Sequence, residues 1–160
     1  MTKHKLHINF EVYESASELA ASDQALLEQA RQALAYSYSP YSNFKVGVAA
    51  QMANGEILSG SNYENAAYPL CICAEQSVLA SAASRMPGVA VVALAVVVKS
   101  SNKIISSPAA PCGGCRQVIC ETEQRNQQTI RLLLQVETGP VYALQKGEDL
   151  LPLAFGGGFL

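Results

Sequence analysis

A run of ten apolar residues, Val89–Val98, constrains the fold of this chain more than any other segment. The run is rich in valine, which favours a strand, and it lacks the apolar–polar alternation of a strand with one wet face. Its length is about half of the roughly 20 apolar residues that a membrane-spanning helix needs. We therefore expect a central strand with both faces covered by other layers of the protein.

Patterns on either side of this run predict further helices and strands. Asn54-Gly55 is a strong hairpin signal between two strand-like segments, and Pro40 and Pro87-Gly88 end two helical segments. The order of elements predicts an α/β fold, a three-layer α/β/α sandwich with a central mixed five-stranded sheet. The expected elements are an arm strand at 6–12, a helix starting at Ser15 or near Ser22, strands at 46–52 and 57–61, helices at 73–85 and 112–124, and strands at 130–136 and 141–144.

The composition indicates one well-buried globular domain. Of the 160 residues, 49% are hydrophobic and 15% are charged, which is typical of a folded chain with a sizeable core. We divide the chain into an N-terminal arm (1–21), a main domain (22–155) and a glycine-rich tail (156–160). The repeated glycines at 156–158 form the only low-complexity stretch.

Charge and cysteine usage exclude several classes of partner. The net charge of −2 gives no electrostatic reason to bind a nucleic-acid polymer or an anionic membrane. The first residues are basic but have no apolar core or cleavage site of a signal peptide. Five clustered cysteines are an odd number for a disulfide framework, so we expect reduced thiols or a metal site, and a cytoplasmic location.

Three cysteines have the spacing of a zinc site. Cys112 and Cys115 stand at i and i+3 where a helix is expected to start, so both sulfurs lie on one face. Cys73 is also at an expected helix N-terminus, where the helix dipole favours thiolate. Three thiolates hold Zn²⁺ and leave its fourth position open for water, whose protons Glu75 could transfer.

Other interpretations of the cysteines remain open from the spacing alone. Cys71 could complete a closed structural site with the other three, and Cys112-x-x-Cys115 could be a redox dithiol. Cys71 and Cys73 are only two residues apart, which is a tight spacing for sharing one ion. Glu75 stands where a base is needed, so we favour the open, catalytic site. Cys120, within a helix, is expected to be a small buried hydrophobe.

Several motifs in a fixed order resemble the cytidine deaminases of the small homotetrameric, zinc-dependent class. Pro-Cys-x-x-Cys together with a Cys-or-His-x-Glu element is the known signature of zinc nucleobase deaminases. The similarity extends from about Leu26 to Phe155 and rests on the segments 38–47, 62–70, 73–75, 111–117 and 150–155.

This resemblance implies a reaction and a set of site residues. The reaction is hydrolytic deamination of cytidine and deoxycytidine to uridine and deoxyuridine, in pyrimidine salvage. Glu75 would be the proton shuttle, and one zinc per subunit would be bound by Cys73, Cys112 and Cys115. A homotetramer is implied, in which some residues complete a neighbouring subunit's site. The substrate-binding residues would be Phe44, Asn62, Glu64, Ala74, Tyr68 and Phe155, the last two from the neighbouring subunit.

One departure from the family pattern concerns the residue after the glutamate, commonly arginine and here Gln76. Without that positive charge we expect the water's pKa to fall less, unless Arg116 and the two helix dipoles compensate. Glu64 near the sugar would repel a phosphate, which favours a nucleoside over a nucleotide. Alternatives are a deaminase of another cytosine nucleoside, of the blasticidin S type, or a non-catalytic zinc-stabilised oligomeric module.

Overall fold

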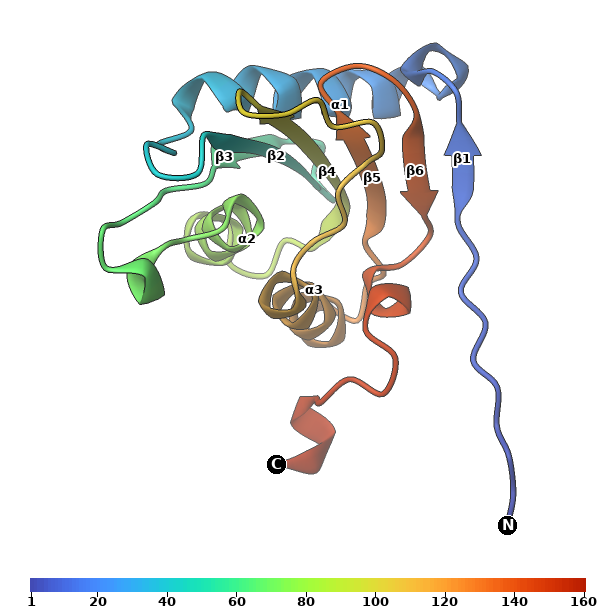
Figure 1. The fold of residues 1–160 in the computed structure, drawn as a ribbon. Coiled ribbons are helices and arrows are strands. Elements are labelled where there is room, and N and C mark those ends of the chain that lie inside the picture. The colour runs from blue at the N-terminus through green and yellow to red at the C-terminus, as the bar shows by residue number, and fades with distance from the viewer.

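The computed structural model describes residues 1–160 and has the predicted α/β architecture, a mixed sheet between layers of helices (Figure 1). The sheet has six strands in the order β1-β6-β5-β4-β2-β3. Only β4 and β5 pair in parallel, and all other neighbours are antiparallel. The strands are β1 (Glu11–Tyr13), β2 (Phe44–Met52), β3 (Ile57–Ser61), β4 (Val91–Ser100), β5 (Arg131–Val136) and β6 (Val141–Leu144).

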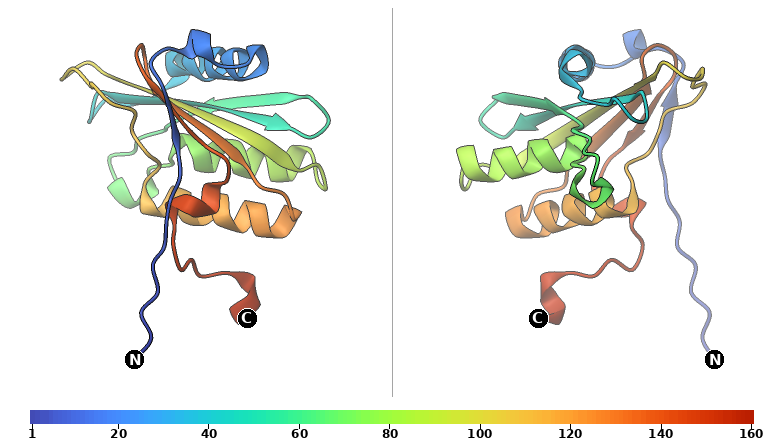
Figure 2. Two further views of the ribbon diagram at one scale, coloured as in Figure 1. Left: turned by 90° about the vertical axis from the view of Figure 1, so that its right-hand side faces the viewer. Right: turned by 60° about the vertical axis from the view of Figure 1, so that its left-hand side comes forward.

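Three helices cover the two faces of the sheet. Figure 2 shows α1 on one face, and α2 and α3 side by side on the other. Short 3-10 turns occupy 16–18, 34–36, 68–70, 147–150 and 157–159. No helix in the chain combines the length and apolar character needed to span a bilayer. The helices are α1 (Ala21–Ala33), α2 (Ala74–Arg85) and α3 (Gly113–Asn126).

The valine-rich run is the buried centre of the sheet, as its pattern predicted. From Val91 to Val98 every residue except Val92 is buried, and Val97 is fully buried. One hydrophobic cluster fills the space between the sheet and α2 and α3, and a second lies under α1. The α1 side of the sheet carries small residues, including Ala49 and Ala95, which lets the helix approach closely.

The prediction of five strands was wrong by one edge strand. An arm strand was expected at 6–12, but residues 6–10 form no strand, and Glu11–Tyr13 instead pair with β6 in the register Val12 to Tyr142. Arg131 fixes this edge, because its guanidinium lies 3.1 Å from Asp23 and 3.8 Å from Glu11. The helix of the N-terminal region begins at Ala21, and Ser15 instead caps a 3-10 turn through a capping box with Glu18.

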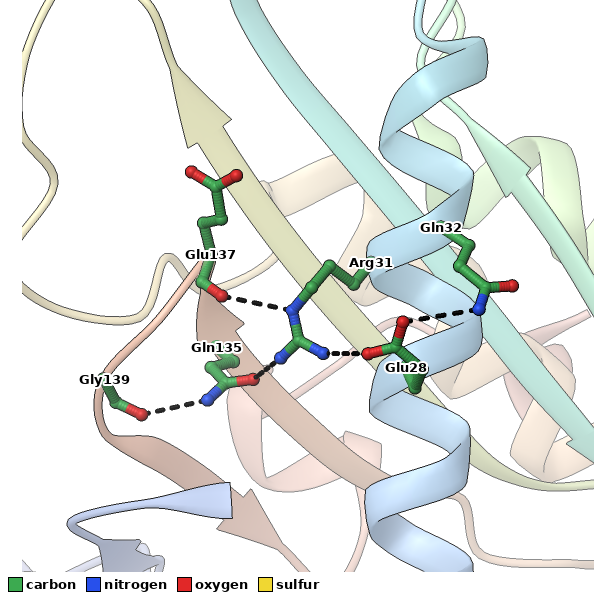
Figure 3. A network of polar contacts seen from close by, with 6 residues as sticks. All are labelled: Glu28, Arg31, Gln32, Gln135, Glu137 and Gly139. Atoms are coloured by element: carbon green, nitrogen blue, oxygen red, sulfur yellow. Dashed lines mark hydrogen bonds and ion pairs between the residues drawn. The ribbon is translucent and has the colours of Figure 1, made fainter. Parts of the chain in front are cut away.

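A polar network joins α1 to the C-terminal end of β5 and to the turn that follows it (Figure 3). Arg31 donates through Nε to the carbonyl oxygen of Glu137 at 3.1 Å, and through its terminal nitrogens to Gln135 and Glu28. Gln135, which is buried, donates in turn to the carbonyl of Gly139 at 2.9 Å. The guanidinium therefore satisfies a buried amide and holds the turn between β5 and β6 against α1.

Candidate active site

Two helix N-termini bring the three cysteines together. Cys73 is the N-cap of α2 and Cys112 is the N-cap of α3, both with extended backbone conformations. Cys115 lies one turn into α3 and is fully buried. Because both helices begin at these residues, the positive ends of their dipoles face the sulfurs and favour negative charge there.

The sulfur positions fit a tetrahedral metal ion. The Sγ atoms of Cys73, Cys112 and Cys115 all lie within 4.8 Å of one another, and Cys112 and Cys115 are 3.5 Å apart. Zn–S bonds of about 2.3 Å at tetrahedral angles place two sulfurs about 3.8 Å apart. Three soft sulfur donors at this spacing match zinc and leave its fourth position to a ligand from outside the protein.

The protons of this cluster are shared unequally. The Cys115 thiol donates to the Cys73 sulfur, which lowers the pKa of Cys73 to about 6. The same hydrogen bond, followed by burial, raises the pKa of Cys115. The cluster therefore already holds one sulfur ready as thiolate, and binding of a metal displaces the remaining protons.

Cys71 is not part of the cluster. Its sulfur accepts a hydrogen bond from the backbone N–H of Asn65 at 3.2 Å, and that loop holds it apart from the other three. The closed four-cysteine site therefore lacks its fourth member. Cys120 is buried in α3, as expected of a small hydrophobe, and burial raises the pKa of its thiol.

Glu75 lies beside the metal ligands in the first turn of α2. Its side chain is only 5% exposed, and burial raises the pKa of the carboxyl above its ordinary value. Hydrogen bonds from its own backbone N–H and from Cys115 oppose this shift. A buried carboxyl with a raised pKa is suited to both accept and return a proton near neutral pH.

Gln76 and Arg116 act on the surroundings of the cluster in different ways. Gln76 Nε2 donates to the Cys115 sulfur across 3.9 Å. Arg116 donates to the carbonyl oxygens of Pro111 at 2.7 Å and Leu150 at 2.9 Å. The expected compensation by Arg116 is therefore indirect, since its hydrogen bonds hold the loop before α3 to the C-terminal segment and none reaches a sulfur.

A cavity of about 490 Å³ opens in front of the cluster. Its lining is mostly apolar with a few convergent polar groups, which is the usual character of a small-molecule site. Eight of the ten residues expected at the site line this one cavity. They are Phe44, Asn62, Glu64, Cys73, Ala74, Glu75, Cys112 and Cys115.

Residues 20–130 of the chain match the family described as the cytidine and deoxycytidylate deaminase zinc-binding region. The matched segment is more than two thirds of the chain and contains all three clustered cysteines and Glu75. This chain belongs to that family. The resemblance predicted from the motifs, and with it the expectation of a deaminase, is confirmed.

Relatives and solved structures agree with this assignment. The chain is 44% identical over 98 residues to a cytidine deaminase of Halalkalibacterium halodurans, covering 61% of this chain and 70% of that protein. It is 39% identical over 127 residues to one of Mycobacterium tuberculosis, covering 79% and 84%. The crystal structure of a Burkholderia pseudomallei cytidine deaminase superposes with a TM-score of 0.72 at 40% identity, covering 86% of this chain and all of that one.

Asn62 has a largely structural set of contacts in this deaminase. Its Oδ1 accepts hydrogen bonds from the Ser37 hydroxyl at 2.6 Å and from the Val46 N–H at 2.8 Å. Its Nδ2 donates to the carbonyl of Phe44 at 2.9 Å. An amide nitrogen has two hydrogens, so Asn62 keeps one N–H for a ligand in the cavity while it fixes the start of β2.

Glu64 is held by residues from the loop before β2. One oxygen accepts from the N–H of Tyr41 at 2.9 Å and of Ser42 at 3.3 Å, and the other accepts from the Ser42 hydroxyl. The Ser42 hydroxyl bond is the chief reason that the pKa of Glu64 is lowered. The deaminase therefore presents an ionised carboxylate beside the cavity, with free lone pairs to accept hydroxyl hydrogens.

Two expected residues lie outside the cavity within one chain. Tyr68 is exposed and lies in an adjoining hollow with Tyr41, and the two rings meet edge to face. Phe155 is on the C-terminal segment and stacks on Phe159, with centroids 5.6 Å apart. Its carbonyl accepts from Gln117 at 2.8 Å. Both side chains are exposed, and the expectation that they reach a neighbouring subunit stays a prediction.

Sequence reasoning missed several residues that shape the site. Ser42 bonds the Glu64 carboxylate and also accepts from the N–H of Phe44 at 3.0 Å, so it positions both. Val98 and Ala109 form part of the apolar wall. Ser42 could have been found from its place in the segment 38–47, on which the family resemblance rests. Nothing in the local sequence marked Val98 as more than a core residue.

Proposed function

We propose that this chain hydrolyses cytidine and 2′-deoxycytidine to the corresponding uridines and ammonia, as a cytoplasmic enzyme of pyrimidine nucleoside salvage. The observation that carries the proposal is the joint placement of a three-sulfur cluster, a buried carboxyl and two polar groups for a sugar in one cavity. Relatives named cytidine deaminase at 39–44% identity support the same substrate.

Cys73, Cys112 and Cys115 would hold one zinc ion in each subunit. When bound, zinc lowers the pKa of a coordinated water toward neutrality and so supplies a nucleophile. Glu75 accepts one proton of the attacking water and passes it to N3 of cytosine. It then takes the second proton from the oxygen now attached to C4 and gives it to the amino group, which leaves as ammonia. The products balance: cytidine and one water give uridine and one ammonia.

The remaining cavity residues orient the nucleoside. Phe44 packs on the nucleoside, and the backbone of Ala74, at the start of α2, lies near the base. Asn62 donates its free N–H and Glu64 accepts from the sugar hydroxyls, since the two follow one another at i and i+2 beyond the end of β3. An ionised Glu64 disfavours a 5′-phosphate nearby.

A homotetramer is the proposed assembly. Exposed aromatic and aliphatic side chains line the cavity and the hollow beside it, and large exposed apolar patches mark interaction sites. Tyr68 in this patch and Phe155 on the C-terminal segment would complete a neighbouring subunit's cavity. The patch comprises Tyr38, Tyr41, Tyr63, Tyr68 and Ile72.

Product analysis with a panel of substrates tests the proposal. Zinc-loaded protein is incubated with cytidine, 2′-deoxycytidine, dCMP and blasticidin S, and the products are separated by chromatography. We expect conversion of both nucleosides and little of dCMP. Better turnover of dCMP than of deoxycytidine would contradict the role given to Glu64. Turnover of blasticidin S alone, or of none of the four with zinc bound, would replace this proposal by one of the two alternatives.

A further inference from the structure

Ahead of β1, the N-terminal arm has no hydrogen-bond partner within its own chain. Residues 1–10 make no backbone hydrogen bond and no side-chain hydrogen bond. In Figures 1 and 2 the arm continues from β1 past the end of β6 as the outermost segment of that edge. The edge of β1 that faces away from β6 is also free, because β1 ends the sheet order.

The arm nevertheless carries the pattern of a half-buried strand. Leu6, Ile8, Phe10 and Val12 alternate with polar residues, and these four side chains are 46–65% exposed. Phe10 lies beside the ring of Tyr142, with centroids 5.2 Å apart, while Leu6 and Ile8 border an open hollow shared with residues of the segment 146–154. A strand with an apolar stripe and unpaired backbone groups is a template for pairing with another chain.

The order of side chains makes the arm complementary to itself. The stripe from Leu6 to Val12 has Asn9 at its midpoint. An antiparallel pairing of two arms centred on Asn9 sets Leu6 opposite Val12 and Ile8 opposite Phe10. Residues directly opposite share one face of the sheet, so the two apolar stripes lie side by side on that face and pack against each other.

Charges match in this same register. His7 falls opposite Glu11, and His4 falls opposite Glu14, since the arm is basic before Asn9 and acidic after it. Moving the centre of the pairing to Ile8 would place His4 opposite the apolar Val12. Moving it to Phe10 would place Leu6 opposite the acidic Glu14. Parallel pairing in register would instead place like charges beside each other.

We propose that the arm pairs with the arm of a second copy of this chain, as antiparallel strands with a two-fold axis at Asn9. Such an isologous contact uses one segment twice and extends the two sheets into one across the free edge of β1. The deaminase of Burkholderia pseudomallei is covered in full by 86% of this chain, so part of this chain has no counterpart there. The pairing does not depend on the proposed tetramer contacts or on the proposed reaction.

Disulfide trapping tests the register in the full-length, zinc-loaded protein. Asn9→Cys places two thiols directly opposite one another, at a Cα separation of about 4.5–5.5 Å that a disulfide spans. Lys5→Cys is the matched control, because the two copies of residue 5 would be eight positions and so about 27 Å apart. Each variant is oxidised briefly with diamide at two protein concentrations, and the linked peptide is identified by mass spectrometry, with the wild-type chain as the blank for its natural thiols.

We expect Asn9→Cys to form the 9–9 link at least tenfold faster than Lys5→Cys forms a 5–5 link. The linked fraction should persist on dilution, and adding Ile8→Lys to Asn9→Cys should abolish it. Absence of the 9–9 link, equal linking at position 5, or a yield that falls in proportion to concentration would overturn the proposal.

Discussion

The side-chain amide of Gln76 donates to the sulfur of Cys115 across 3.9 Å, and this neutral contact is the direct side-chain link from Gln76 to the metal ligands. The family commonly places an arginine at this position. A neutral donor offsets the negative charge of three thiolates less than a guanidinium would. We therefore expect the acidity of a zinc-bound water at this site to depend on the residue at position 76.

Replacing this amide by a cation should change the pH dependence of turnover. A hydrogen bond from a charged group contributes about 1.5–3 kcal/mol, against about 1 kcal/mol for a neutral one. We therefore expect Gln76→Arg to move the acid limb of the kcat/KM profile to lower pH and to change activity roughly tenfold. Gln76→Leu is the control that removes the donor without adding charge. An unchanged profile in Gln76→Arg would contradict this role.

Glu75→Gln should separate catalysis from metal binding and from folding. Loss of the proton shuttle is expected to lower kcat by at least ~10²–10⁴-fold. Zinc content should be unchanged, because no ligand is altered. Metal analysis and steady-state kinetics on the same sample check both, and full turnover with zinc retained would rule out the mechanism.

The same variant predicts a pH-dependent gain in stability. Burial raises the pKa of Glu75, so the native state holds this proton more tightly than the unfolded chain does. The free energy of unfolding contributed by Glu75 therefore falls as pH rises from the unfolded carboxyl pKa through the raised native pKa. In metal-free protein at neutral pH, Glu75→Gln should have the higher thermal midpoint, and the difference should vanish in acid. A lower midpoint at neutral pH would contradict this sign.

Glu123 is expected to be a stability residue with no part in the reaction. Its buried carboxylate accepts from the backbone N–H groups of Ile130 at 2.7 Å, Gly147 at 2.8 Å and Glu148 at 2.8 Å. Glu123→Gln replaces one acceptor by a donor that faces these groups, at a cost of about 1–3 kcal/mol. Glu121→Gln, on the exposed side of the same helix, should cost almost nothing. Urea unfolding compares the two, and equal midpoints would refute the assignment.

Gly47 should tolerate no side chain. A Cβ there would stand 2.9 Å from the backbone nitrogen of Leu34 and still closer to the carbonyl of Ala30, because β2 passes directly under α1. Gly47→Ala must push the helix off the sheet, and overpacking of this kind costs about 1–3 kcal/mol. Gly158→Ala, whose Cβ meets nothing, is the control. Thermal unfolding should show a lower midpoint for Gly47→Ala only.

The parts of the fold that local patterns encode could be predicted. The valine run gave the central strand because burial on both faces removes the need for alternation. Asn54-Gly55 marked the hairpin because few other residues adopt the backbone angles of its turn, and Gly55 has φ +88°. The pairing of Val12 with Tyr142 could not be predicted. It joins residues 130 positions apart, and the local pattern of a strand does not identify the strand with which it pairs.

In the candidate site too, features within one helix could be predicted, and contacts between distant segments could not. Cys112 and Cys115 could be placed together because one helical turn separates them, and the caps at Cys73 and Cys112 followed from helix-start signals. The three partners of the Asn62 side chain could not be foreseen, because Ser37 precedes the loop before β2 while Phe44 and Val46 are in β2, and folding brings Asn62 to both segments. The roles of Tyr68 and Phe155 depend on a second subunit and stay predictions.

Loss of cytidine absorbance is the measurement that tests the account most directly. Purified zinc-loaded protein and its Glu75→Ala variant, matched in zinc content, are mixed with cytidine and followed in the ultraviolet. We expect steady loss of absorbance with the wild-type chain and at least ~10²-fold slower loss with the variant. No loss with either protein, or equal loss with both, would contradict the claim that the sulfur cluster and Glu75 form a cytidine-deaminating site.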